Sequence, residues 1–118
     1  MSQVKIKRLE RDVPITLSTA TATATTLRLE DMAGAVVTFG TMSTNAVSLQ
    51  LWVATAADAS FSRLYGADGS AADITLAPST TQGRSYALPD AAFAVPWLKI
   101  VSGTTNSTGT IGIVSMKS

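Results

Sequence analysis

The 118-residue chain contains no cysteine and no histidine. Without cysteine, the fold has neither disulfides nor thiolate metal ligands. Without histidine, it lacks the commonest metal ligand and the commonest general base, which excludes the usual serine and cysteine triads. A phosphate-binding loop of the GxxxxGK[ST] type is also missing from the sequence. We therefore expect a protein that is not an enzyme and binds no metal or other cofactor.

Charge is scarce as well. Only 14% of the residues are charged, with nine basic residues against eight acidic ones, whereas 46% are hydrophobic. So apolar a chain is not disordered. Its near-zero net charge argues against nucleic acid as a partner, because neutralising phosphates requires a concentrated basic face. A weakly charged surface suits a subunit that remains in contact with other subunits.

Long hydrophobic runs are missing too. The longest covers residues 91–98 and is interrupted by Pro96, far short of the ~20 residues of a membrane span. The first 14 residues are charged from Lys5 onward and contain no apolar core of the signal-peptide type. We therefore expect a protein that is made in the cytoplasm, stays soluble and has no membrane partner.

The chain does contain many short segments with a period of two. The clearest is residues 46–55, where Leu49, Leu51 and Val53 alternate with residues that point the other way, Trp52 among them. One strand cannot bury its own apolar face, so other strands must cover it. Because Trp52 makes the second face partly apolar as well, we expect this segment to be a central strand.

Eight or nine such strands follow one another about a dozen residues apart, with turn residues between them and no lasting 3.6-residue period. This pattern predicts an all-β fold, a single antiparallel β-sandwich or jelly roll with an extended N-terminal arm. A turn at residues 30–34 is expected to join the strands before and after it into a hairpin. The expected strands are residues 14–18, 19–29, 35–39, 46–55, 61–65, 74–76, 84–88, 92–102 (beginning after Pro96 or bulged there) and 110–117.

Residues 1–13 differ in kind from the sandwich domain expected at 14–118, since they hold four of the nine basic residues. They are either an edge strand guarded by Lys and Arg or an arm that reaches a neighbouring subunit. Residues 19–25 alternate Thr with Ala, which predicts either a half-buried strand or a flat subunit contact. The residues expected to contact a partner are Val4, Lys5, Ile6, Lys7, Arg8, Arg11, Thr21 and Thr23.

Other candidate groups have simpler interpretations. Asp58, Asp68 and Asp73 lack the spacing of a calcium loop, and we interpret them as turn carboxylates. Trp52 and Trp97 could form a sugar-stacking platform if both were exposed on one sheet face, or they could fill the core or the barrel rim.

Residues 25–103, with the phrases TTLRLEDMAGAVVTF, LPD and WLKIVSG, resemble the small all-β head-decoration (cement) proteins and related virion β-sandwiches of tailed bacteriophages. The resemblance implies a non-enzymatic protein on the outer capsid surface of the virion, synthesised in a bacterial host. Its partners would be the major capsid protein and further copies of itself, most often as a trimer that bridges capsid subunits. Alternatives are another phage β-sandwich (head-fibre base, neck or tail) or a carbohydrate-binding adhesive module.

Overall fold

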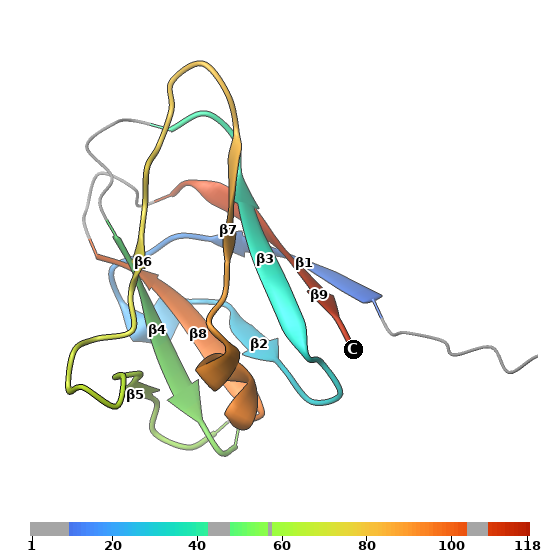
Figure 1. Ribbon diagram of the computed structural model, residues 1–118, viewed down its shortest axis with the longest axis vertical. Helices are drawn as coiled ribbons and strands as arrows, with labels where there is room; N and C mark the ends of the chain where they lie inside the picture. The colour runs from blue at the N-terminus through green and yellow to red at the C-terminus, as the bar shows by residue number, and fades with distance from the viewer. Residues whose placement is uncertain (1–9, 43–47, 57, 104–108) are drawn as a thin grey trace, which may run out of the picture.

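The computed structural model describes residues 10–42, 48–56, 58–103 and 109–118 (Figure 1). These residues form nine strands and two short 3-10 helices. The strands are β1 (Glu10–Thr16), β2 (Thr26–Arg28), β3 (Gly34–Phe39), β4 (Ser48–Ala54), β5 (Ser62–Arg63), β6 (Ile74–Thr75), β7 (Arg84–Ala87), β8 (Trp97–Ser102) and β9 (Ile111–Lys117); the 3-10 helices are η1 (Thr21–Thr23) and η2 (Asp90–Ala94).

The strands form two antiparallel sheets that face each other, so the expected all-β sandwich is confirmed. Sheet A has the order β1-β9-β3-β7. Sheet B has the order β2-β8-β4-β5, with β6 also paired to β4. No helix among the described residues is long and apolar enough to cross a membrane.

The core lies between the two sheets, and β4 is central to it as expected. Leu49 and Leu51 of β4 are fully buried, and β4 pairs β8 on one side and β5 and β6 on the other. From sheet A, Phe39 packs directly over Gly112, where an added Cβ would lie 2.4 Å from the ring. The largest fully buried side chains are Leu17, Leu27, Leu29, Val37, Phe39, Leu49, Leu51, Leu98, Val101, Val114 and Met116.

The expected hairpin across residues 30–34 is wrong. β2 pairs β8 in sheet B, whereas β3 pairs β7 and β9 in sheet A, so the turn carries the chain from one sheet to the other. Asp31 takes a left-handed conformation there (φ 67°), and the Met32 N–H donates to the Leu29 carbonyl at 3.0 Å. Crossing between sheets lets both strands turn their apolar sides into the core.

The strand expected through the Thr/Ala repeat is also wrong. Only Thr26–Arg28 is a strand, and Thr21–Thr23 is the 3-10 helix η1. The Ser18 hydroxyl accepts the Ala20 N–H at 3.2 Å and lies 2.7 Å from the Thr23 hydroxyl. Such local side-chain hydrogen bonds give Ser and Thr backbone an alternative to a sheet ladder.

Pro14 and Pro96 occupy positions where a missing N–H is tolerated. β8 begins at Trp97, directly after Pro96, as one of the two expectations had it. Pro14 lies inside β1, an edge strand of sheet A that runs across the boundary suggested between residues 13 and 14. Edge strands accept proline because one side of their backbone has no partner strand.

Replacing Leu51 with Ala is expected to lower the free energy of unfolding by ~2–5 kcal/mol, because it leaves a cavity in a packed core. Ile111→Ala is the matched control, since Ile111 is also in a strand but is 67% exposed; its effect should stay within about 0.5 kcal/mol. Urea unfolding curves of the two variants measure both values. Equal losses would contradict the assignment of the core to the face that Leu51 occupies.

Candidate interaction surface

No described residue covers the outward side of sheet A, and we call this side the open sheet face. The antiparallel register places its side chains in rows across the four strands. Its members are Glu10, Asp12, Pro14, Thr16, Gly34, Val36, Thr38, Ser85, Ala87, Ile111, Ile113, Ser115 and Lys117.

Large apolar side chains lie in the middle of the open sheet face and at the end of it where β9 begins. Ile111 is 67% exposed, Ile113 47% and Val36 39%. Ile113 stands between Pro14 of β1 and Thr38 of β3 in one row. β9 thus has apolar side chains on both of its sides, since Val114 and Met116 face the core. Its outward side becomes polar at Ser115 and Lys117.

Sheet B differs because its outward side is partly covered. Val101 and Ala54 point outward by their alternation, yet they are only 2% and 6% exposed. The Lys99 Nζ lies 4.5 Å from the centre of the Phe61 ring and donates to the Thr21 carbonyl at 3.2 Å. Loops and η1 therefore shield sheet B where sheet A has no such cover.

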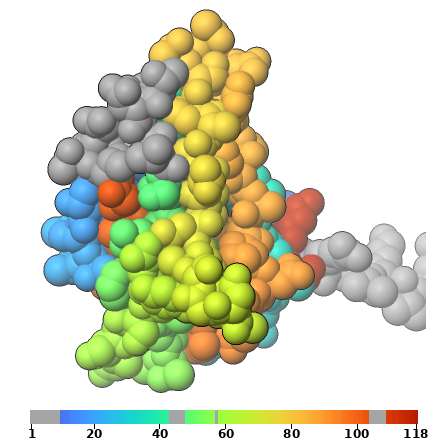
Figure 2. Space-filling model, turned by 60° about the vertical axis from the view of Figure 1, so that its left-hand side comes forward, coloured from blue at the N-terminus to red at the C-terminus, as the bar shows by residue number. Residues whose placement is uncertain are grey.

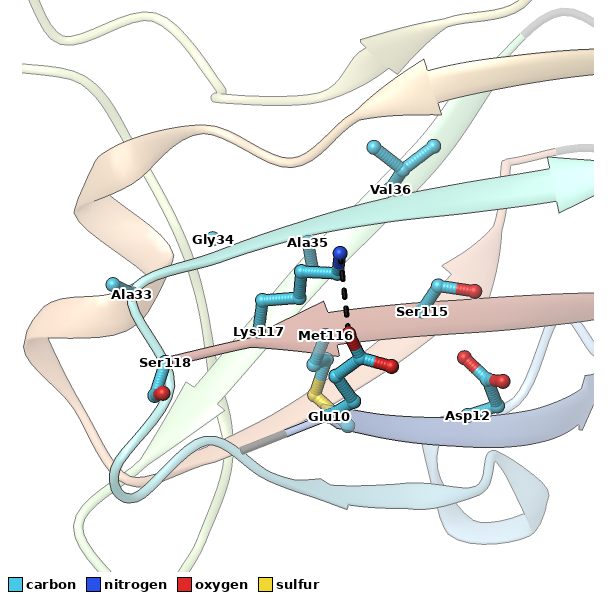
Figure 3. Close-up of a pocket in the computed structure, with 10 residues that line it drawn as sticks. All are labelled: Glu10, Asp12, Ala33, Gly34, Ala35, Val36, Ser115, Met116, Lys117 and Ser118. Carbon is cyan, nitrogen blue, oxygen red and sulfur yellow. Dashed lines mark ion pairs between the residues drawn. The ribbon is translucent and has the colours of Figure 1, made fainter. Parts of the chain in front are cut away.

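The open sheet face ends in a depression of about 430 Å³ (Figure 3). Ser115 of β9 lies between Asp12 on β1 and Val36 on β3, and the small side chains of Ser115 and Gly34 leave the space. Lys117 pairs with Glu10 at 3.3 Å (Nζ to Oε1), whereas no described residue forms an ion pair with Asp12. This end of the face is therefore slightly acidic.

Two other ion pairs lie among the described residues, Arg28 with Glu30 and Arg63 with Asp73. Glu30 accepts hydrogen bonds from Arg28 and Asp73 from Arg63, and these bonds raise the pKa of both guanidinium groups above the usual value. A base whose pKa is raised on folding loses that stabilisation only when the pH rises through the folded-state value. These two pairs therefore produce no change in stability near neutral pH.

Among the described residues, no group of three Asp or Glu side chains is placed to hold a metal ion. Asp68, one of the three carboxylates considered for calcium, accepts the Ser70 N–H at 3.0 Å within the turn at residues 66–70. Asp73 is held by Arg63. These carboxylates act in local structure, as expected of turn residues.

Five of the residues expected to contact a partner, namely Val4, Lys5, Ile6, Lys7 and Arg8, lie outside the described residues. Arg11 lies in β1, on the side that faces sheet B. Its Nη1 donates to the Arg28 carbonyl at 2.8 Å and so joins the edges of the two sheets at β1 and β2.

The opposite side of the sandwich is crossed by residues 64–83, the yellow-green to yellow stretch that Figure 2 shows.

Thr21 and Thr23 lie in η1 rather than in a strand, so they do not form the flat row that the repeat suggested. The Thr21 carbonyl accepts a hydrogen bond from Lys99, and the Thr23 hydroxyl donates to the Ala20 carbonyl at 3.2 Å. Both residues thus take part in contacts within the molecule. The structure does not bring them together with Arg11 into one surface.

Trp52 and Trp97 lie on the outward side of sheet B, on the neighbouring strands β4 and β8. Both are half-buried, so they do not fill the core, while the alternative that they lie at the rim stays a prediction. The Trp52 Nε1 donates to the Gln50 side-chain oxygen at 3.1 Å.

The expected contact residues that the structure describes, Arg11, Thr21 and Thr23, do not belong to the open sheet face. Its signal in the sequence is the final strand, where Ile111 and Ile113 face one way and Val114 and Met116 the other. Only one of these two sides can face the core of a two-layer sandwich. The pattern alone does not say which side is left outside.

The four strands lie about 4.8 Å apart, and β1 and β9 are 7 residues long, β3 6 and β7 4, which makes a face of about 400 Å². That is about half of the ~800 Å² per partner in a standard interface. The chain matches no protein-family model, no curated protein and no solved structure. The open sheet face is therefore identified as the candidate functional region from its geometry alone.

Replacing Ile113 with Lys is expected to leave the free energy of unfolding of the single chain within about 0.5 kcal/mol, since the side chain already meets solvent. Val114→Lys, one position along the same strand, should prevent stable folding because it puts an unpaired charge into the core. Far-UV circular dichroism and urea unfolding distinguish the two outcomes. A large loss for Ile113→Lys would mean that the face is covered within the single chain.

Proposed function

We propose that this protein is a non-enzymatic structural protein of a tailed-bacteriophage virion. It attaches to the outer surface of the capsid and bridges neighbouring copies of the major capsid protein. The observation that carries the proposal is the open sheet face, where Val36, Ile111 and Ile113 are exposed on an otherwise well-packed sandwich. Large apolar side chains exposed close together on one sheet face support a contact region there.

The size of the face fits attachment through many copies. A contact of about 400 Å² is small, and a single copy would bind weakly through it. Several weak contacts on one oligomer bind far more tightly than any one of them, because the later contacts form within the same complex. A trimer that touches several capsid subunits would gain from this effect, and the resemblance across residues 25–103 favours the same arrangement.

The weak charge of the chain supports a protein partner over nucleic acid. The charged residues of the open sheet face are confined to one of its ends, at Glu10, Asp12 and Lys117. A phosphate-binding surface would instead need several unpaired basic side chains together. Synthesis in the bacterial cytoplasm and assembly onto the finished head follow from the same proposal.

Two alternatives remain as outcomes of the test. Another phage β-sandwich role, at a head-fibre base, neck or tail, would place the protein at one site of the particle. A carbohydrate-binding module would use Trp52 and Trp97, which share the outward side of sheet B. The hydrogen bond from Trp52 to Gln50 and the half-buried state of both rings favour the structural role.

Purified protein is expected to co-sediment with capsids that lack it, reaching saturation, and averaged particle images should show it over the whole head. Ile111→Lys with Ile113→Lys should weaken binding at least tenfold, because two charges would be buried in the contact. The matched control, Thr26→Lys with Thr75→Lys, adds the same charge at exposed positions of sheet B and should bind normally.

Absence of wild-type protein from the sedimented capsids would contradict the proposal. Density at a single vertex or at the tail would favour the second role. Binding to a glycan array that is lost in Trp97→Ala would favour the adhesive module.

A further inference from the structure

The backbone of β1 has an unpaired side. β1 pairs β9 and no other described strand. The Leu17 N–H donates to the Thr110 carbonyl at 2.8 Å, and these residues continue the β1–β9 register. Because bonded and non-bonded pairs alternate in an antiparallel ladder, the odd-numbered residues of β1 bond to β9. The backbone groups of Glu10, Asp12 and Thr16 therefore point away from the sheet, and we call this side the open edge.

The two faces of β1 at the open edge have different chemistry. Glu10 and Asp12 are exposed on the outward face, and Asp12 forms no ion pair with a described residue. Arg11 and Val13 lie on the inward face and are half-buried, with Val13 packed against the core. A strand added here would be best matched by basic side chains on one face and apolar side chains on the other.

Residues 3–7 of the chain have this composition. Lys5 and Lys7 alternate with Val4 and Ile6, so an extended segment carries lysines on one side and aliphatic groups on the other. In the antiparallel register that places Lys7 opposite Glu10, Lys5 lies opposite Asp12 and Val4 lies opposite Val13. Opposite charges and apolar pairs at directly opposed positions both stabilise an antiparallel pair of strands.

The segment is poorly placed to pair with its own β1. Only Arg8 and Leu9 would remain to form the turn between Lys7 and Glu10. Two-residue hairpin turns need positive φ at a central position and prefer Gly, Asn or Asp there. Nine extended residues reach about 30 Å, which is enough to reach an adjoining molecule. The open edge is therefore better suited to the segment of another chain.

We propose that the open edge of β1 binds residues 3–7 of a second copy of this chain as an added strand. Main-chain hydrogen bonds hold the added strand, as in other cases of strand addition, and the alternate side chains set its register. Pro14 has no N–H to offer, which limits the pairing to the acidic end of β1. The inference goes beyond the proposed virion role and holds for the purified protein alone.

Light scattering after size-exclusion chromatography tests the exchange directly. The full chain should have a mass that is a multiple of 12.2 kDa, and the chain without residues 1–9 should run as a single copy. Lys5→Glu with Lys7→Glu should raise the dissociation concentration about tenfold or more, and Glu10→Lys with Asp12→Lys should do the same. Combining all four changes in one chain should restore assembly, because the charges are again opposite.

The matched control for Glu10→Lys with Asp12→Lys is Asp58→Lys with Asp90→Lys. It makes the same change in net charge at exposed positions outside β1 and should assemble normally. Circular dichroism confirms that each variant is folded. A single-copy mass for the full chain would overturn the proposal. So would an oligomer that persists without residues 1–9, or failure of the variant with all four substitutions to assemble.

Disulfide trapping separates exchange from pairing within one chain, and the absence of native cysteine makes the readout clean. Lys5→Cys protein and size-tagged Asp12→Cys protein, mixed and oxidised, should give a covalent heterodimer; Lys7→Cys tests the adjacent register. Lys5→Cys mixed with Asp90→Cys is the control. A yield no higher than this control in both registers would overturn the proposal, as would an exclusively internal disulfide in Lys5→Cys/Asp12→Cys.

Discussion

One constraint organises this structure: a two-layer sandwich offers a single interior, but sheet A has apolar side chains on both of its faces. Val114 and Met116 of β9 fill the interior together with β4 and β8. Ile111 and Ile113 of the same strand are left on the outside. Removal of these side chains from water is favourable, which is why we propose that a second molecule covers the outward side of sheet A.

The outward sides of the two sheets are covered to different extents. On sheet B, η1 and the loop carrying Phe61 lie over Lys99, and Val101 is buried although it points outward. Sheet A has no such loops among the described residues, and the charged side chains of its outward side lie at one end, beside the depression. The difference gives the molecule one shielded face and one face suited to contact, with the unpaired edge of β1 beside it. The proposed contact face thus lies next to an open edge, so a partner could bind through both side chains and main chain.

Much of the fold could be predicted from the sequence, because period-two alternation around Leu49 and Leu51 is a direct consequence of burying one face. The path between sheets could not, since the turn at Asp31 is compatible with both a hairpin and a crossover. The Thr/Ala repeat was misleading because local hydrogen bonds from Ser18 compete with a strand. Of the candidate surface, β9 carried a visible signal, but its outward side depends on which face Phe39 and the opposing sheet cover.

Thiol labelling at position 113 tests most directly whether the open sheet face is a contact surface. Ile113→Cys introduces the single cysteine of the chain, and a Thr75→Cys variant provides an exposed reference on sheet B. With the protein bound to virions, maleimide should label position 113 at least tenfold more slowly than in the dissociated single chain, while position 75 keeps its rate. Equal labelling of position 113 in the free and the assembled protein would contradict the central claim.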